Sequence, residues 1–418
     1  MTKLWRQGLV DIDAPVANYA DPVLRKQNGT TLLELWHGDR TILNVTARML
    51  MGMRGGLWDY NDTWYFDETI NDPAVDVTPF DLLHLQNKTW NCRPGTCGQY
   101  ASTGFEILGL VLMGAAGSEH YYTYDQKSMF RTKALRAKFA ETAFPGPGPC
   151  SQDHRIVHQY ATTPYSKTKH GRHNPINPTV AQNLTIKDLI NGSCLNGWTC
   201  GNIAASPADI AQFHWELHHG NIVSKASLEQ MMHFVPMKTG WSPQLYGLGL
   251  MHTFPYQGWP WLPDPANDTY TIGHAGADYG SLGMMSGWNV KHGFGVAFTT
   301  NTDNSLNCSH QRYDVVDSDS RIFFVDALCP AYDEVLQVRS TLAMSSGHDR
   351  LVLGFWGGAS SLVGARLPYD LRCPFVFGSR FLCCLVFPDG FTAVPCSSHT
   401  CTVAALLIRS SPTELCPG

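Results

Sequence analysis

The sequence predicts an α+β, mixed α/β, fold in which a helical subdomain precedes an antiparallel sheet. Helical periodicity and capping signals mark much of the chain before residue 270, and glycine-separated strand-like runs follow as far as residue 300. The chain has 418 residues, of which 44% are hydrophobic and 16% charged, as in a globular protein with a substantial core. This length fits one large domain or two smaller ones.

Three helical segments are predicted in the first part of the chain. Residues 4–8 have the form of a last helical turn that ends at Gly8. Residues 42–53 are mostly apolar and are predicted to be helical as far as the next pair of glycines. A further helix is expected to begin near Ser102, because apolar residues follow at helical spacing, namely Phe105, Leu108 and Leu112.

The clearest helix start lies at Ser206. Serine is a good N-cap, Pro207 suits the first helical position, and Asp209 stands where the acid of a capping box belongs. Gly220 is predicted to end this helix.

Strand-like runs replace the helical pattern after this point. Residues 270–273, 281–288 and 294–300 are predicted to form an antiparallel meander. Residues 312–328 again have a helical apolar side, which predicts a helix that closes the domain.

The end of the chain differs from the rest. Residues 341–418 contain no Lys and six of the 13 Cys, and they show no clean periodicity. We therefore expect one domain over residues 1–330 and a Cys-rich extension over 331–418. The extension is either disulfide-bonded or an artefact of the gene model, and the second reading is favoured.

Composition excludes several classes of function. The formal net charge of -5 is mild and gives no reason to expect binding to nucleic acid or to an anionic membrane. No apolar run has the roughly 20 residues of a membrane span; residues 375–387 come nearest, and Arg380 interrupts them. No cofactor is expected, and the oligomeric state is left open.

Several features indicate a secretory protein. N-x-[ST] sequences are enriched, and unused acceptors in a cytosolic protein are the alternative reading. No apolar stretch of signal-peptide length follows Met1, so we expect the targeting signal upstream of it. The predicted location is outside the cell or in the secretory-pathway lumen. The acceptors are Asn28, Asn44, Asn61, Asn87, Asn183, Asn191, Asn267 and Asn307.

Cysteine spacing favours the same location. Cys92 with Cys97, and Cys194 with Cys200, are spaced so that each pair could close a small disulfide loop in an oxidising compartment. The first spacing also fits half of a zinc site, but no second pair of the same kind follows. Disulfides are therefore preferred to a metal.

Two places are suited to chemistry. Tyr100 and Ser102 stand just before an apolar helix, where both could face a cleft near the N–H groups of the helix start. A neighbouring cation would lower the pKa of such a Tyr and let it carry protons. His274 lies between small residues, which would let a substrate run close along a strand edge.

Several segments together resemble the boxes of serine β-lactamase-like proteins, which have the penicillin-binding-protein fold. They occur in the family's order over roughly residues 4–330, and this joint match is specific, although the usual His and Ser of the second segment are replaced. The segments are residues 9–16 for "G-x-L-x-L-D-x-P-V", 49–57 for "LL-x-H-x-SGL", 100–109 for "Y-x-N" and its helix, 201–209 for "GG-x-x-ST-x-x-D", 273–276 for the His form of "K-T-G", and 293–301 for the following strand.

The resemblance implies roles for individual residues. Tyr100 matches the catalytic Tyr that relays a proton between nucleophile and leaving group. Ser102 stands in place of the usual Asn, and His274 stands in place of Lys, as a partly protonated group near the Tyr. Gly276 and Ala277 would bind substrate, with the Ala277 N–H in the oxyanion hole.

The nucleophile of the family lies in an S-x-x-K box, which we expect roughly ten residues before Met1. The nucleophile helix and the first strands of the β-lactamase/transpeptidase-like fold are therefore expected to be missing. Ser166 and Lys169 match S-x-x-K, but in a polar loop, and are interpreted as a chance match. His214 and His218 do not have the glutamate position of a zinc-protease motif, so no metal is expected.

These observations leave two hypotheses. The first is a serine hydrolase that acts by acyl transfer on an ester, amide or lactam of a small-molecule or peptide substrate. We expect these 418 residues to be inactive on their own, because the S-x-x-K box is absent. The second is a non-catalytic binding protein on the same fold, which the replaced residues and Ser102 make credible. The enzyme is the preferred hypothesis for the full gene product.

Overall fold

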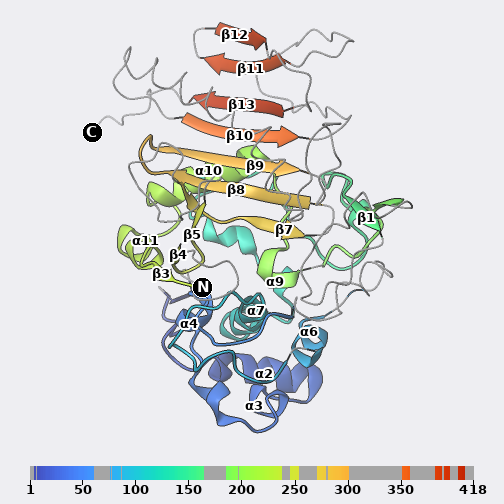
Figure 1. Cartoon of the computed structure of the whole chain (residues 1–418), viewed down its shortest axis with the longest axis vertical. Coiled ribbons are helices and arrows are strands. Elements are labelled where there is room, and N and C mark those ends of the chain that lie inside the picture. Colours follow the sequence, from blue (N-terminus) through green and yellow to red (C-terminus); the bar gives the residue numbers. More distant parts are fainter. Residues whose placement is uncertain are drawn as a thin grey trace, which may run out of the picture.

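A computed structural model describes most of the chain up to residue 300 and four later strands. The described residues are 4–5, 7–60, 76, 78–85, 87–163, 185–195, 197–237, 245–253, 271–278, 281–300, 351–357, 382–387, 390–395 and 403–409. The predicted helix at 312–328, and Ser166 with Lys169, lie outside them. One group of helices gathers at one end of the molecule, and the sheet, with further helices beside it, lies toward the other (Figure 1).

The helical end begins where the sequence predicts a helix stop. Gly8 has a φ of 71°, and its N–H donates to the Trp5 carbonyl at 3.0 Å. The predicted continuous helix at 42–53 is wrong, because Val45 and Thr46 are extended and Thr46 caps a new helix there. The elements of this end are α2 (Ala17–Asn28), α3 (Leu32–Leu35), η1 (Arg40–Asn44), α4 (Ala47–Met51), α6 (Pro79–Leu85) and α7 (Thr103–Ala116).

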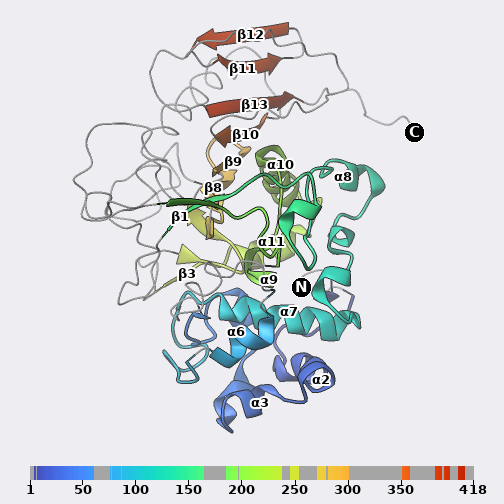
Figure 2. The same ribbon diagram turned by 90° about the vertical axis from the view of Figure 1, so that its right-hand side faces the viewer.

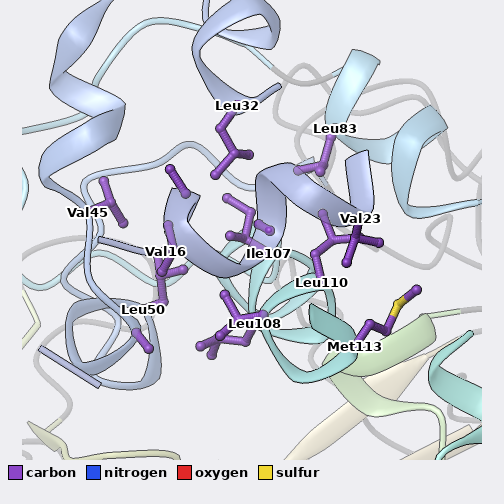
Figure 3. Packing of buried hydrophobic residues seen from close by; sticks show 14 of the residues in the cluster. Val16, Val23, Leu32, Val45, Leu50, Leu83, Ile107, Leu108, Leu110 and Met113 are labelled. Carbon is purple, nitrogen blue, oxygen red and sulfur yellow. The ribbon is translucent and has the colours of Figure 1, made fainter. Parts of the chain in front are cut away.

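Helix α7, predicted from Ser102, is the centre of this end of the molecule. It packs against α2 so closely that a Cβ at Gly114 would lie 2.1 Å from the Tyr19 carbonyl oxygen. Leu24, Ile107 and Val111 are fully buried in the shared core. Figure 3 shows members of this cluster, among them Val23, Ile107 and Leu110. Each such side chain contributes about 1.5–3 kcal/mol to stability through burial.

A long connection joins α7 to the sheet. Its elements are η3 (Tyr121–Thr123), η4 (Gln126–Met129), α8 (Lys133–Ala137), η5 (Cys150–Gln152), β1 (Tyr160–Thr163), β2 (Thr185–Asp188), α9 (Trp198–Gly201), α10 (Pro207–His218) and α11 (Lys225–Met231). The predicted start of α10 is confirmed, since the Ser206 hydroxyl accepts from the Asp209 N–H at 3.1 Å. The carboxylate of Asp209 instead accepts from the Thr142 hydroxyl.

The disulfide pattern differs from the prediction at one of the two loops. Cys92 and Cys97 are paired at disulfide distance, as the spacing predicts. Cys194 pairs with Cys150 rather than with Cys200, so the predicted Cys194–Cys200 loop is wrong. Tertiary structure sets this pairing. The Cys150 N–H donates to the Gly192 carbonyl at 3.0 Å, so the two segments, distant in sequence, lie side by side.

The predicted meander is confirmed as the middle of a larger sheet. Its order is β13-β10-β9-β8-β6-β5-β4-β3, with β7 paired to β8. Helix α10 packs on one face (Figure 2), where a Cβ at Gly295 would lie 2.1 Å from the Ala211 carbonyl oxygen. The strands are β3 (Val235–Pro236), β4 (Leu245–Tyr246), β5 (Met251–Thr253), β6 (Thr271–Gly273), β7 (Gly276–Asp278), β8 (Ser281–Asn289), β9 (Phe294–Thr300), β10 (Leu351–Gly357) and β13 (Val403–Arg409).

Strands from the C-terminal segment extend this sheet. Strand β10 runs parallel to β9, with Phe355 opposite Phe298, and β13 pairs antiparallel with β10. A separate hairpin consists of β11 (Leu382–Phe387) and β12 (Gly390–Pro395). The domain boundary at residue 330 stays a prediction. In the described part of the chain, no helix has the length and apolar character that a membrane crossing needs.

Candidate active site

Two loops hold the segment that carries Tyr100. The N–H of Gln99 donates to the Met53 carbonyl, and the N–H of Gly95 donates to the Arg54 carbonyl, both at 2.8 Å. The paired Cys92 and Cys97 close the second loop. These contacts fix the backbone immediately before Tyr100 and thereby set where its side chain begins.

Asp59 and Tyr60 clamp the start of α7. The hydroxyl of Ser102 donates to Oδ2 of Asp59 at 3.3 Å, and the N–H of Tyr60 donates to the Thr103 hydroxyl at 2.9 Å. Ser102 also forms a hydrogen bond with Tyr100. The structure therefore brings the predicted Tyr100 and Ser102 into one network, with Asp59 as an additional member.

His274 lies directly after β6, where two strands approach unusually closely. A Cβ at Gly273 would lie 1.7 Å from the Ser286 carbonyl oxygen, so only glycine fits this position. The N–H of His274 donates to that same carbonyl at 2.9 Å, and the Ser286 hydroxyl donates to the His274 carbonyl at 2.6 Å. Ser286 of β8 thus holds both the N–H and the carbonyl of His274.

Three aromatic rings meet at this point. The ring centroids of Tyr100 and His274 lie 6.4 Å apart, and that of Tyr246 lies 6.2 Å from Tyr100 and 5.6 Å from His274. The Tyr246 hydroxyl lies 2.8 Å from Nε2 of His274. The structure therefore brings Tyr100 and Ser102 together with His274, which lies far from them in sequence.

The predicted substrate-binding residues follow on the next strand. Gly276 is exposed, and a Cβ added to it would meet no atom within 4 Å. Ala277 lies beside it in β7, opposite Leu282 of β8. The two residues thus follow His274 within three positions along the chain.

The electrostatics of the site differ from the expectation. Burial raises the pKa of the Tyr100 hydroxyl, and the nearby carboxyl of Asp59 raises it further; the hydrogen bond with Ser102 opposes both. No cation of the described residues is among the groups that shift this pKa. Burial also lowers the pKa of His274, so its imidazole is neutral at pH 7 rather than partly protonated.

Further buried polar groups beside Tyr100 escaped the sequence analysis. Glu106 on α7 is fully buried, and burial raises its pKa well above the usual value. The thiol of Cys200 lies 3.0 Å from the Tyr60 hydroxyl and also adjoins Glu106. Glu106 could have been identified from the sequence, because it is the one acidic residue in the apolar run of α7. Burying a lone acidic side chain is costly, so such a residue points to a specific role.

The His214 and His218 pair is part of the packing of α10. Glu216 between them accepts from Lys138 Nζ at 2.7 Å and from the Gln212 amide at 2.6 Å, so its carboxylate is fully engaged. Within the described residues, no cluster of His, Cys, Asp and Glu could hold a metal ion.

Comparison with known proteins supports the same family. The family model described as Beta-lactamase matches residues 1–318. No curated protein sequence matches the chain.

Solved structures show the same fold at low sequence identity. A D-stereospecific amidohydrolase from Streptomyces sp. is 19% identical, with 79% of this chain and 82% of that chain covered and a TM-score of 0.53. The D-amino acid amidase from Ochrobactrum anthropi SV3, in complex with L-phenylalanine, is 15% identical, with 82% and 81% covered and a TM-score of 0.50. Because the Beta-lactamase family model matches most of the length of this chain, the chain belongs to the β-lactamase family.

Proposed function

We propose that the chain is a β-lactamase-related serine hydrolase that acts by acyl transfer on an amide, ester or lactam of a small molecule or peptide. The convergence of Tyr100, Ser102 and His274 beside the strand edge at Gly276 carries this proposal. The fold shared with two amide-hydrolysing enzymes is consistent with an amide substrate.

In the proposed reaction a serine hydroxyl attacks the carbonyl carbon, and its proton passes by way of Tyr100 to the leaving group. The N–H of Ala277 would stabilise the oxyanion. Water then attacks the carbonyl carbon of the acyl-serine ester, the bond to the serine oxygen breaks, and the proton of the water passes by way of Tyr100 to that oxygen, which releases the acid. Substrate would lie along the edge formed by Gly276, where a side chain would leave less room.

Tyr100 cannot take up the serine proton unless it first loses its own. Burial and the charge of Asp59 both oppose that loss. The ammonium group of an S-x-x-K lysine beside Tyr100 would offset them, because a nearby positive charge favours phenolate. We therefore propose that the nucleophile and this lysine belong to a box that the described residues do not supply, and that these 418 residues alone lack the activity.

The test is labelling with a fluorophosphonate probe. The chain as given is compared with a chain extended by the natural sequence encoded upstream of Met1, and with a Tyr100→Phe variant of the extended chain. Labelling only of the extended chain, with strong loss on Tyr100→Phe, supports the proposal. An upstream sequence without an in-frame S-x-x-K box overturns it.

A non-catalytic binding protein is the second candidate, and a specific observation favours it. The protonated Tyr100 and the neutral His274 form a polar but uncharged surface, which binds ligands without activating a nucleophile. Calorimetric binding of a β-lactam or a D-amino acid amide by the extended chain, with no probe labelling, would select this candidate.

We also propose that the protein is a secreted or lumenal glycoprotein. All four sequon asparagines among the described residues are exposed. At Asn87 the Thr89 hydroxyl lies 2.7 Å from the amide oxygen, so the acceptor and its hydroxyl already adjoin. Disulfide pairing of Cys150 with Cys194 fits the same compartment. The four are Asn28, Asn44, Asn87 and Asn191.

The glycoprotein proposal is tested by expression in a eukaryotic secretory host. Removal of N-glycans with an endoglycosidase should lower the mass, and Asn87→Gln should remove one glycan. Thr89→Ser, which keeps the hydroxyl, is the matched control and should retain it. An unchanged mass after enzyme treatment contradicts the proposal.

A further inference from the structure

We infer that Tyr246 is a positioning residue that holds His274 in one tautomer, with Nε2 as a hydrogen-bond acceptor facing the site. The inference rests on the proposed function, because it concerns the same site and states which protonation form of His274 that site uses. No motif or spacing in the sequence marks Tyr246.

The hydrogen-bond partners of His274 determine its tautomer. Nδ1 contacts the carbonyl oxygen of Ala275, and a carbonyl can only accept, so Nδ1 must carry the proton. In a neutral imidazole Nε2 is then unprotonated. The Tyr246 hydroxyl, 2.8 Å away, therefore donates to Nε2. Both ring nitrogens are satisfied in this arrangement and in no other neutral one.

Tyr246 is itself held rigidly. Its side chain is 1% exposed, and its backbone pairs with Val235 of β3 and with Met251 of β5. The next residue, Gly247, approaches α11 so closely that a Cβ there would lie 2.0 Å from the Met231 carbonyl oxygen. Because the backbone of Tyr246 is fixed in this way, its phenol can fix the orientation of the His274 imidazole.

The charge state of the pair agrees with this role. Burial, and then the neighbouring Tyr100, raise the pKa of the Tyr246 hydroxyl, so it remains protonated, and a donor, at neutral pH. Among the residues that the structure describes, Tyr246, Tyr100 and His214 are the titratable groups found to interact with His274. None of them carries a charge at neutral pH, so the pair acts through hydrogen-bond direction rather than through charge.

The hydrogen bond from Tyr246 also limits what His274 can offer a substrate. Because Nε2 is occupied by Tyr246, His274 does not present a free N–H to a substrate oxygen. The Tyr246 hydroxyl keeps lone pairs that can accept a second hydrogen bond. Its ring lies edge-on to that of Tyr100, at an interplanar angle of 77°, with the ring centroids 6.2 Å apart, so the two phenols are neighbours in the site.

The test is a long-range ¹H–¹⁵N spectrum of the full chain with ¹⁵N-labelled histidine, in which a His274→Gln variant assigns the signals. The expected wild-type result is a protonated Nδ1 and an unprotonated, hydrogen-bonded Nε2. Tyr246→Phe should shift the Nε2 signal toward that of an imidazole nitrogen without a donor and populate the second tautomer. Tyr100→Phe, which also removes one hydroxyl from the same face, should leave the tautomer unchanged.

A protonated Nε2 in the wild-type spectrum overturns the inference, and so does an unchanged Nε2 signal in a folded Tyr246→Phe variant. If that variant fails to fold, the wild-type spectrum alone still decides the tautomer. The measurement needs no turnover. Absence of probe labelling would therefore count against the proposed function and leave this inference standing, and the reverse also holds.

Discussion

The hydroxyl of Ser102 donates to Oδ2 of Asp59 across 3.3 Å. A carboxylate can only accept, so the Ser102 proton points to Asp59 and the Ser102 oxygen is left to accept from Tyr100. The phenol proton is thus directed to Ser102. An Asn side chain, usual for the family at this position, has a separate donor and acceptor and would impose no such direction.

Asp59→Asn and Ser102→Ala are predicted to shift the pKa of Tyr100 in opposite directions. Removing the charge of Asp59 lowers this pKa, because a like charge no longer opposes the phenolate. Removing the Ser102 hydroxyl raises it, because a phenolate can only accept and loses the donor that Ser102 becomes when its proton turns from Asp59 to Tyr100. Burial, the largest cause, stays the same in both variants.

The measurement is ¹⁹F NMR of a chain with difluorotyrosine at position 100, whose phenol is more acidic than that of tyrosine. The titration midpoint is compared among the parent chain, Asp59→Asn and Ser102→Ala. Shifts of the same sign in both variants would show that solvent access, not the hydrogen-bond network, controls the phenol.

The disulfide pattern gives a second prediction. A Cys150→Ser, Cys194→Ser double variant should lose about 4 kcal/mol of unfolding free energy, because the bond closes a loop with a sequence separation of 44. The loop closed by Cys92 and Cys97, with a separation of 5, is expected to contribute less. Urea unfolding measures both.

Peptide mapping without reduction checks the pairing itself. A fragment that joins Cys150 to Cys194 is expected, and Cys200→Ser should leave it intact. A fragment joining Cys194 to Cys200 would restore the pairing that the sequence spacing suggests.

The sequence predicts the helices with local signals but not the contacts that depend on tertiary structure. Helices α7 and α10 were predictable because their signals are local: apolar spacing after Ser102, and a serine cap followed by proline at Ser206. The partner of Cys194 was not predictable, because it depends on the chain reversal that brings Cys150 to it. Tyr246 was missed because β4 has only two residues, too few for an alternating pattern.

Buried histidines predict a loss of stability in mild acid. Burial lowers the pKa of His214 from 6.5 to about 3, with His218 and His274 adding to the shift, and lowers that of His252 to about 4. Between pH 6.5 and about 4 the unfolded chain therefore binds protons that the folded chain excludes. Stability is complete above this window and falls as the pH falls through it.

The pH dependence is measured by urea unfolding at a series of pH values. His214→Gln should flatten the fall between pH 6.5 and 4, because it removes one group that gains a proton on unfolding. His233→Gln is the matched control, since His233 is exposed, and should leave the slope unchanged. Equal slopes in the parent chain and His214→Gln would rule out a contribution of His214.

Two glycines on either side of His274 are predicted to respond oppositely to alanine. At Gly273 the added Cβ would lie 1.7 Å from the Ser286 carbonyl oxygen, which is backbone and cannot move without opening β6 from β8. At Gly276 the added Cβ would meet nothing within 4 Å. Gly273→Ala should therefore lower the unfolding free energy by more than about 2 kcal/mol, whereas Gly276→Ala should change it by less than about 0.5 kcal/mol.

Thermal and urea unfolding of the two variants measure this difference, and the His274 ¹⁵N signals report the site in the same samples. Gly273→Ala should disturb these signals, because His274 takes its backbone position from the contact with Ser286. Gly276→Ala should leave them unchanged and weaken only the binding of a ligand that lies along the strand edge. A destabilised Gly276→Ala would mean that this edge is covered by protein, and the substrate position proposed for Gly276 and Ala277 would then be wrong.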